Sequence, residues 1–507
     1  MSTSRRIVSA FCAAAAVLVA ALPARAGLDD VKVTTDTSID CSSLATIARD
    51  LYGGCKSDHD KAIATWYFVR RVEFHWPHVP TWDTIDLINS YGFGLCGYQS
   101  TAFAQICTAG GLKARLCHLP GHVIAEAFYN SGWHMFDCQV GWYALNRQGK
   151  VASCQEMKDD PSLVTRAVEE GRASKPYFQC RDNPRGGTNY AARARGGESL
   201  RTVPTTRLVI NLRRGESITR VWGNEKKPWF ADKGNDGRPN TSFLEPAHLC
   251  TAAGVDENDP VNWPFWKPYA LVASRDGGKI RYGLKRYYGN GRMVYAPDLT
   301  SPACLADLPR DALANVQPGP TGLQPAEAGR DASVTIPVEC PYVITDAWLN
   351  ASAFRADGKD VLALAVRGRG GQWKEVYRAG KTGRLTLERF SLKDAAFGGK
   401  KYQVRITLRS AAKTADVSVA RLTLTTVFIN NMYALPYLSP GRNTVRITAA
   451  DGVDLATNRL ALEYAWQEEG ADKTLTRVID RLPFQAVIEV GGRELPRMKS
   501  VRLSVAP

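Results

Sequence analysis

Three segments decide the fold of the N-terminal part of this 507-residue chain: Gly94-Leu95-Cys96-Gly97, Gly121-His122-Val123-Ile124 and Gly132-Trp133-His134-Met135-Phe136-Asp137. The first stands directly before a run at 98–109 that predicts a helix, closed by two glycines. The other two lie in a pair of strand-like runs around an Asn-Ser-Gly turn. The sequence therefore predicts a helix with Cys96 at its N-terminus, followed by a β-hairpin at 122–140.

The position of Cys96 has a chemical consequence. The N-terminus of a helix presents unpaired N–H groups and a partial positive charge. Such a site lowers the pKa of a thiol and favours the thiolate. The same N–H groups can hold the oxyanion that forms when a thiolate attacks a carbonyl.

His122 and Asp137 are the expected partners of Cys96. His122 is placed at the start of one hairpin strand and Asp137 towards the end of the other. A Cys nucleophile, a His base and an Asp that orients the base would form a catalytic triad. The sequence leaves the hairpin register open, because a bulge at Gly132 would decide whether both side chains face the same way.

These segments resemble the core of the transglutaminase-like superfamily. The resemblance rests on Cys96-Gly97-Tyr98-Gln99, on Gly121-His122-Val123-Ile124-Ala125-Glu126 and on Gly132-Trp133-His134-Met135-Phe136-Asp137, with Ala109-Gly110-Gly111-Leu112-Lys113-Ala114-Arg115 between them. It covers 60–145, about a sixth of the chain. It implies an α+β, papain-like fold with Cys96 as nucleophile, His122 as base and Asp137 as orienter, and no cofactor. Tyr91 and Gln99 become candidates for oxyanion or substrate contacts.

Other interpretations compete for single residues. His118 is a second candidate base, although it lacks the strand pattern that follows His122, and His134 is interpreted as structural. A zinc site would need Cys117, His118, His122 and Cys138, which lack paired ligands at short spacing. The acidic run at 256–259 lacks an EF-hand pattern and is typical of a polar loop.

Residues 1–26 are typical of an export signal, with a charged start, an apolar run and Ala24-Arg25-Ala26 as the cleavage site. We therefore expect a periplasmic, extracellular or cell-surface protein without a membrane span after cleavage. Cleavage would remove Cys12 and leave eleven cysteines. In an oxidising compartment cysteines usually pair. The resemblance makes Cys96 the reduced one, so that the other ten are expected to form up to five disulfides.

The remaining chain is expected to be mainly β-structure. The predicted organisation is a signal peptide at 1–26, a catalytic core at 27–181, a linker or exposed loop at 182–204, a β-rich aromatic-basic region at 205–312, a linker at 313–332 and one or more β-sandwich modules at 333–507. The fold class is thus a multi-domain protein with an α+β core, a β-rich middle region and a C-terminal β-sandwich.

Composition limits the partners. The formal net charge of +15 falls to +12 without the export signal, which suits an acidic partner such as an anionic glycan. Nucleic acid is not expected for an exported chain, and the oligomeric state stays open. The triad favours a thiol enzyme that acts on amide bonds of a peptide, glycopeptide or cell-wall peptide. The alternatives are a glycan-binding scaffold with an idle core and a transglutaminase that cross-links proteins.

Overall fold

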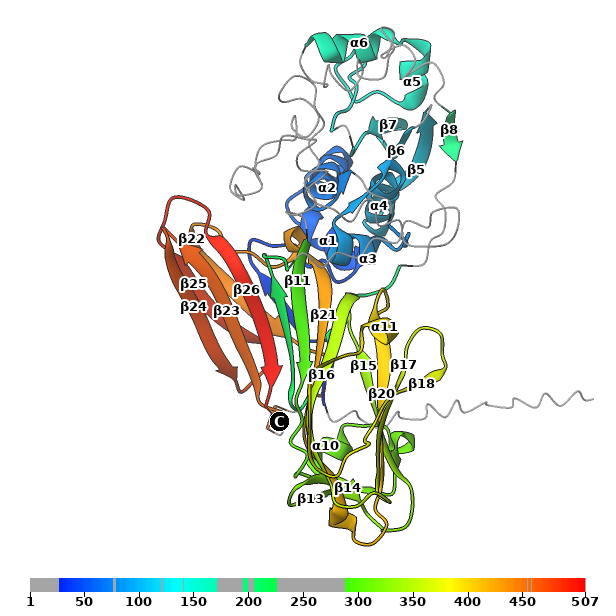
Figure 1. The fold of residues 1–507 in the computed structure, drawn as a ribbon. Coiled ribbons are helices and arrows are strands. Elements are labelled where there is room, and N and C mark those ends of the chain that lie inside the picture. Colours follow the sequence, from blue (N-terminus) through cyan, green and yellow to red (C-terminus); the bar gives the residue numbers. More distant parts are fainter. Residues whose placement is uncertain are drawn as a thin grey trace, which may run out of the picture.

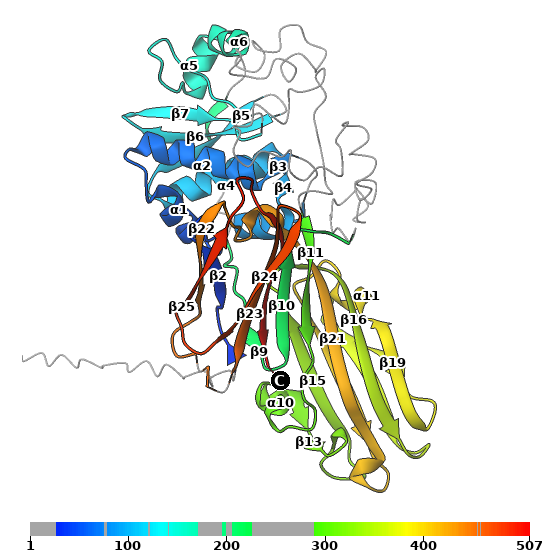
Figure 2. The same cartoon turned by 90° about the vertical axis from the view of Figure 1, so that its left-hand side faces the viewer.

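The computed structural model describes residues 27–75, 79–119, 122–139, 141–170, 195–198, 205–225, 288–453, 455–456 and 458–506. The expected export signal, the acidic run at 256–259 and most of the aromatic-basic region lie outside these residues. Figures 1 and 2 show a lobe of helices and a small sheet standing on a larger part made of strands. The described residues contain no helix that is long and apolar enough to cross a membrane.

The helical lobe is formed by described residues between 44 and 198. Its helices are α1 (Leu44–Tyr52), α2 (Asp58–Val72), α3 (Thr84–Asp86), the π-helix η1 (Leu87–Tyr91), α4 (Cys96–Ala109), α5 (Cys154–Asp159) and α6 (Ser162–Glu169). Ser43 and Ser57 begin α1 and α2 by accepting hydrogen bonds from backbone N–H groups of the first turn. Helix α4 is almost wholly buried between α1, α2 and the small sheet, which confirms the predicted helix.

The small sheet has the order β7-β6-β5-β8. Its strands are β5 (Lys113–Leu119), β6 (His122–Tyr129), β7 (Gly132–Phe136) and β8 (Arg195–Glu198). Asn130 and Ser131 both have positive φ, which is the turn geometry that joins twisted strands by two residues, so the predicted hairpin is confirmed. The loop expected at 182–204 is wrong for 195–198, since β8 pairs with β5.

The larger part is built on one ten-stranded sheet. Its path runs β13-β14-β21-β11-β10-β26-β23-β24, and β16 and β19 extend it from β21. These strands are β10 (Glu216–Val221), β11 (Tyr288–Tyr295), β13 (Val316–Gly319), β14 (Gly322–Pro325), β16 (Val343–Arg355), β19 (Gly383–Ser391), β21 (Val417–Asn431), β23 (Leu460–Glu468), β24 (Ala471–Ile479) and β26 (Arg497–Val505).

Two smaller sheets cover this large sheet. The five-stranded one has the order β12-β15-β20-β17-β18 and the three-stranded one the order β2-β22-β25. Their strands are β2 (Lys32–Thr35), β12 (Leu313–Ala314), β15 (Ala332–Glu339), β17 (Val361–Arg367), β18 (Trp373–Arg378), β20 (Lys401–Arg409), β22 (Gly441–Thr448) and β25 (Phe484–Val490). Alternate residues of β15, β20 and β23 are buried in one continuous apolar core. The predicted β-sandwich is therefore present as two sandwiches that share a sheet.

Several predicted boundaries differ from the structure. The linker expected at 313–332 is wrong, because β12, β13 and β14 occupy it. The region at 205–312 is not separate, since β10 and β11 lie inside the large sheet. The N-terminal strand β2 pairs with β22, and β1 (Gly27–Leu28) pairs with β9 (Leu212–Arg213), so the first described residues belong to the β part. Strands that pair over such distances in the sequence cannot be recognised from the local pattern of residues.

The cysteine prediction is largely wrong. Among the described residues Cys117 and Cys154 form a disulfide, which joins β5 to the start of α5. The unpaired cysteines of the described chain are Cys41, Cys55, Cys96, Cys107, Cys138, Cys304 and Cys340. Most of them are buried in apolar surroundings and serve as small core residues.

Asn431, at the end of β21, fastens the helical lobe to the β part. Its side-chain NH2 group donates to the carbonyl of Val72 at 2.8 Å and to that of Ile88 at 2.6 Å, and its Oδ1 accepts from Tyr433 N–H. Gly92, with φ +70°, leaves room for it, because a Cβ there would lie 2.6 Å from Asn431 Cγ. The two parts therefore share a packed, hydrogen-bonded junction.

We expect Asn431→Ala to lower the free energy of unfolding by about 2–5 kcal/mol, because two buried carbonyl groups would lose their donor. The measurement is urea unfolding followed by intrinsic fluorescence. Asn350→Ala is the control, since the Asn350 side chain accepts only one exposed backbone N–H, that of Arg389. Equal unfolding midpoints for the two variants would show that the junction carries little of the stability.

Candidate active site

Cys96 is the first residue of α4 and is half-buried. The N–H groups of Tyr98 and Gln99 bond to the carbonyl of Leu95 at 2.9 and 3.3 Å. The N–H groups of Cys96 and Gly97 have no such acceptor within the described residues. Two backbone donors thus remain beside the thiol, which is the arrangement that an oxyanion requires.

His122 lies directly beside Asp137. His122 begins β6, Asp137 follows the end of β7, and His122 Nε2 is 2.7 Å from Asp137 Oδ2. The pairing of β6 with β7 runs from Tyr129–Gly132 to Ala125–Phe136 without a bulge. Asp137 is the next residue after this ladder, where it forms a bridge with Trp142 and its carboxylate reaches His122. The register that the sequence left open is the one that brings them together.

The backbone of Asp137 is fixed from two sides. Its N–H donates to the carbonyl of Trp142 at 3.0 Å, and its carbonyl accepts Trp66 Nε1–H at 2.9 Å. The Asp137 side chain has no exposed surface, and that of His122 is 5% exposed. Trp66 lies on α2, and its bond to Asp137 has no signal in the local sequence.

The buried carboxylate controls the charge of His122. Burial lowers the pKa of His122, but the charge and hydrogen bond of Asp137, together with Cys96, outweigh it and raise the pKa to about 10. The imidazole is therefore protonated at neutral pH. With Nε2 turned towards Asp137, Nδ1 is the ring nitrogen left for Cys96.

The pKa of Cys96 lies below its ordinary value. Burial raises it, but the hydrogen bond and charge of His122 and the backbone N–H of Val123 outweigh burial and the nearby Asp137. A thiolate facing an imidazolium follows from these two shifts. The other titrating thiols show the opposite direction: burial raises the pKa of Cys55, Cys107 and Cys340.

Helix α4 and strand β6 are tied together at the site. Ser100 Oγ donates to the carbonyl of Val123 at 2.9 Å, one residue beyond His122. This bond fixes the distance between the helix that carries the thiol and the strand that carries the imidazole. The sequence gives no signal for it, since serine in a helix more often bonds within its own turn.

Trp82 is an aromatic residue at the site that the sequence analysis missed. Its indole is stacked on Tyr98 with ring centroids 4.0 Å apart, and it lies against Gly97, where a Cβ would be 3.4 Å from the ring. Trp82 is nevertheless 42% exposed. An open aromatic surface one residue from the thiol is a platform on which a substrate can rest.

Tyr91 and Gln99 do not fit the roles expected of them. Gln99 is buried, and its Nε2 donates to the carbonyl of Glu73 at 2.9 Å, so it is turned away from solvent and substrate. Tyr91 is 2% exposed and packs its ring against the edge of Phe93 in the core of the lobe. The prediction that they contact an oxyanion or substrate is wrong, because both side chains are buried in the interior of the lobe.

The contacts of His134 and of the proposed zinc ligands decide between their alternative roles. His134 has both ring nitrogens on backbone carbonyls, those of Val151 at 2.5 Å and Tyr129 at 3.0 Å, which fits the structural role expected of it. The structure does not gather the zinc set, since Cys117 is bonded to Cys154 and His122 is held by Asp137.

The grouping of Cys117, Cys154 and Glu126 brings three potential metal ligands close together in the described chain. The two sulfurs are joined to each other, and the Glu126 oxygens accept from Arg115 Nε–H at 2.7 Å and from Cys154 N–H at 2.8 Å. The donor atoms of this group are thus already engaged in bonds within the protein.

Comparisons with known proteins give little for the whole chain. No family model and no curated protein matches it. One of the similar solved structures is a xanthan lyase from Paenibacillus, which is 11% identical in sequence. The match covers 39% of this chain and 26% of the lyase chain, with a TM-score of 0.16. Another is the dimeric latent PorU from Porphyromonas gingivalis, at 11% identity over 44% of this chain and 21% of that one, with a TM-score of 0.19. This chain thus spans about a quarter or less of the length of each.

Proposed function

We propose that this protein is a thiol enzyme that acts on amide bonds through a covalent acyl-enzyme on Cys96. The observation that carries the proposal is the buried His122–Asp137 pair, 2.7 Å apart, next to a thiol whose pKa is lowered at the start of a helix. A thiol that served only as a core residue would have its pKa raised by burial, as Cys107 does. This difference between the pKa shifts of Cys96 and Cys107 favours a working active site over a catalytically idle core.

The reaction begins with attack of the Cys96 thiolate on the carbonyl carbon of the amide. The N–H groups of Cys96 and Gly97 hold the oxyanion. His122 gives its Nδ1 proton to the leaving nitrogen, the C–N bond breaks, and the acyl group stays on sulfur as a thioester. His122, now neutral, takes a proton from the incoming water as it attacks the thioester, which releases the acid and restores the pair.

The substrate is proposed to be an amide in a peptide, a glycopeptide or a cell-wall peptide. Trp82 supports this class, because an exposed indole next to the nucleophile suits the flat face of a peptide bond, an apolar side chain or a sugar ring. If an amine rather than water takes the acyl group, the same intermediate gives a cross-link. Hydrolysis and cross-linking share the triad and differ only in the acceptor, which is water in the first reaction and an amine in the second.

The test is to trap the acyl-enzyme. The full chain is incubated with a panel of casein peptides, glycopeptides and muropeptides, quenched in acid and measured by intact mass. We expect an acyl adduct on Cys96 that hydroxylamine removes, and its absence in Cys96→Ala. Cys55→Ser is the matched control, because Cys55 is another incompletely buried thiol, one whose pKa burial raises. An adduct that persists in Cys96→Ala would overturn the proposal.

A fluorescent primary amine in the same incubation separates hydrolysis from transamidation. We expect the free acid to exceed the amine conjugate at millimolar amine, because Cys96 is only half-buried and water is far more concentrated than the amine. A conjugate that predominates would identify a cross-linking enzyme, and the thioester on Cys96 would be common to both results.

A further inference from the structure

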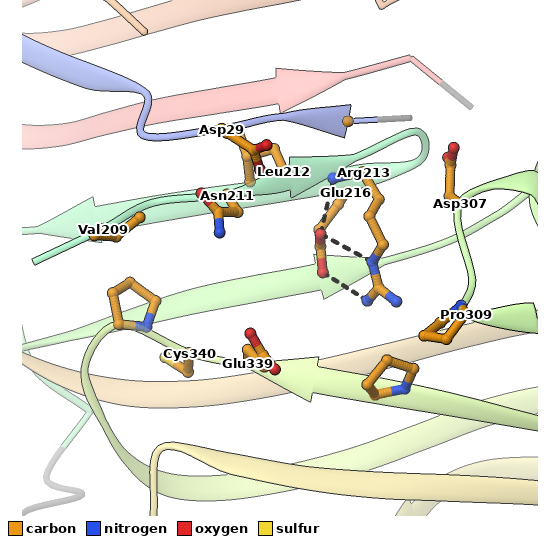
Figure 3. A pocket seen from close by; sticks show the side chains of 13 residues that line it. Asp29, Val209, Asn211, Leu212, Arg213, Glu216, Asp307, Pro309, Glu339 and Cys340 are labelled. Atoms are coloured by element: carbon orange, nitrogen blue, oxygen red, sulfur yellow. Dashed lines mark hydrogen bonds and ion pairs between the residues drawn. The ribbon is translucent and has the colours of Figure 1, made fainter. Parts of the chain in front are cut away.

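A second cavity lies in the β part, away from Cys96. Its volume is about 220 Å³, and Figure 3 shows its walls. They come from β1 and β9, from the first residue of β10, from the segment after α10 (Ala303–Ala306) and from the end of β15. In Figures 1 and 2 these elements lie in the β part near the C-terminus, whereas α4 lies in the helical lobe. The cavity is thus distinct from the candidate active site.

Arg213 supplies an unused donor to this cavity. Its Nε and Nη2 donate to Glu216 at 3.3 and 3.0 Å, and its guanidinium is stacked 4.1 Å from the centre of the Tyr295 ring. Its Nη1 is buried and has no partner. Figure 3 shows that the terminal nitrogen not bonded to Glu216 points away from it, on the side of Pro309. A buried guanidinium nitrogen without an acceptor is costly, so the site suits a ligand oxygen there.

The remaining lining carries an excess of carboxylates. Glu216 is matched by Arg213, and Asp307 by Arg214. Asp29 adds a further carboxylate to this lining. An anionic ligand would meet this excess at short range, which is unfavourable. The expectation of an anionic glycan therefore does not extend to this cavity.

A ligand with several hydroxyl groups fits both features. A hydroxyl accepts a hydrogen bond from Arg213 Nη1 and donates one to a carboxylate or to Asn211 Oδ1. Pro309, Pro337 and Pro341 form part of the wall. Proline rings are rigid and offer an apolar surface to the C–H face of a sugar ring. Because proline has no backbone N–H, this surface brings no donor that would need an acceptor.

We propose that this cavity binds one neutral saccharide unit, with Arg213 and Asp29 as the polar contacts that select it. A unit held there would attach the enzyme to a glycan while the thiol acts elsewhere on the same material. The ligand class follows from the donor and acceptor pattern of the cavity and does not rest on the reaction proposed for Cys96.

The test uses the full chain as Cys96→Ser, so that binding is measured without turnover. Methyl β-glucoside, methyl N-acetyl-β-glucosaminide and glucuronic acid are titrated by saturation-transfer NMR and calorimetry. We expect at least one neutral glycoside to bind and glucuronic acid to bind more weakly. Arg213→Lys retains a cation for Glu216 but loses Nη1, and we expect about tenfold weaker binding, the loss typical of one buried charge-assisted bond.

Arg214→Lys is the matched control. Arg214 is the next residue, pairs with Asp307 and is not part of the lining, so its replacement leaves binding unchanged. If Arg213→Lys fails to fold, Asp29→Asn replaces it, and binding is again expected to weaken. Equal affinities in the Arg213 and Arg214 variants, stronger binding of glucuronic acid, or no binding of any neutral glycoside would overturn the proposal. An acyl-enzyme on Cys96 would be unaffected by any of these results.

Discussion

Replacing His122 with alanine is expected to abolish the acyl transfer proposed for Cys96, with a loss of about 10³-fold or more in the rate of thioester formation. The hydrogen bond and charge of His122 are the main factors that lower the pKa of the Cys96 thiol. Without them burial and Asp137 both raise this pKa, against only the Val123 N–H. The thiol would then be protonated at neutral pH, and no group would protonate the leaving nitrogen.

The measurement is the rate at which the acyl adduct appears on Cys96 after mixing with the best substrate. His59→Ala is the control, since His59 lies in the same lobe but bonds the Tyr129 hydroxyl, at 2.9 Å, and not a residue of the triad. We expect this variant to retain the wild-type rate. A His122→Ala variant that forms the adduct within tenfold of wild type would rule out His122 as the proton-transfer group.

Asp137→Asn is expected to lower the same rate by about 10²- to 10⁴-fold while leaving the fold in place, as expected for the residue that orients a catalytic histidine. The amide has nearly the shape of the carboxylate but carries no charge. Burial lowers the pKa of His122, and Asp137 is the largest factor that raises it to about 10. The variant would therefore hold a neutral imidazole at pH values where the wild type holds an imidazolium.

This change has a signature in the pH profile. In the wild type the rate of adduct formation rises with the ionisation of Cys96 and falls as His122 loses its proton near pH 10. In Asp137→Asn the falling limb should move to lower pH. Asp58→Asn, which alters an exposed carboxylate paired with Lys61, is expected to leave both limbs in place. If the falling limb of Asp137→Asn lies at the same pH as in the wild type, Asp137 does not control the charge of His122.

The parts of the fold that were predicted correctly are those whose signal is local. The helix after Cys96 is marked by its apolar residues and by the glycines that end it, and the hairpin by alternation and by Asn130-Ser131. The second strand of the hairpin ends at Phe136, before the predicted end at 140. The proximity of His122 and Asp137 then follows from the register of one hairpin. Such features depend on neighbours a few residues apart, which a single sequence contains.

The features that were missed depend on distant partners. Strand β2 pairs with β22 more than four hundred residues away, and β10 lies between β11 and β26. The resemblance makes Gln99 a candidate substrate contact, yet its amide donates to the carbonyl of Glu73. The prediction of up to five disulfides failed for a similar reason. An oxidising cellular compartment favours disulfide bonds in general, but a particular pair of cysteines can bond only if the fold brings their β-carbons close together.

The shared sheet gives the helical lobe a fixed base. The junction at Asn431 joins the end of β21 to the carbonyls of Val72 and Ile88, and Lys400 forms an ion pair with Asp86 at the same boundary. The lobe that carries Cys96 and the part that carries the second cavity are thus held in one arrangement. A glycan anchored in the cavity would keep a defined position relative to the thiol.

The most direct test of the thiolate–imidazolium pair is the alkylation rate of Cys96 against pH, mapped by mass spectrometry on the full chain. An ordinary thiol titrates near pH 8.5, so its alkylation rate falls about tenfold for each unit below that value. We expect a Cys96 rate that stays level well below this pH, with a midpoint that rises above it in His122→Ala. A wild-type midpoint at or above the ordinary value would contradict the thiolate–imidazolium pair and with it the proposed enzyme.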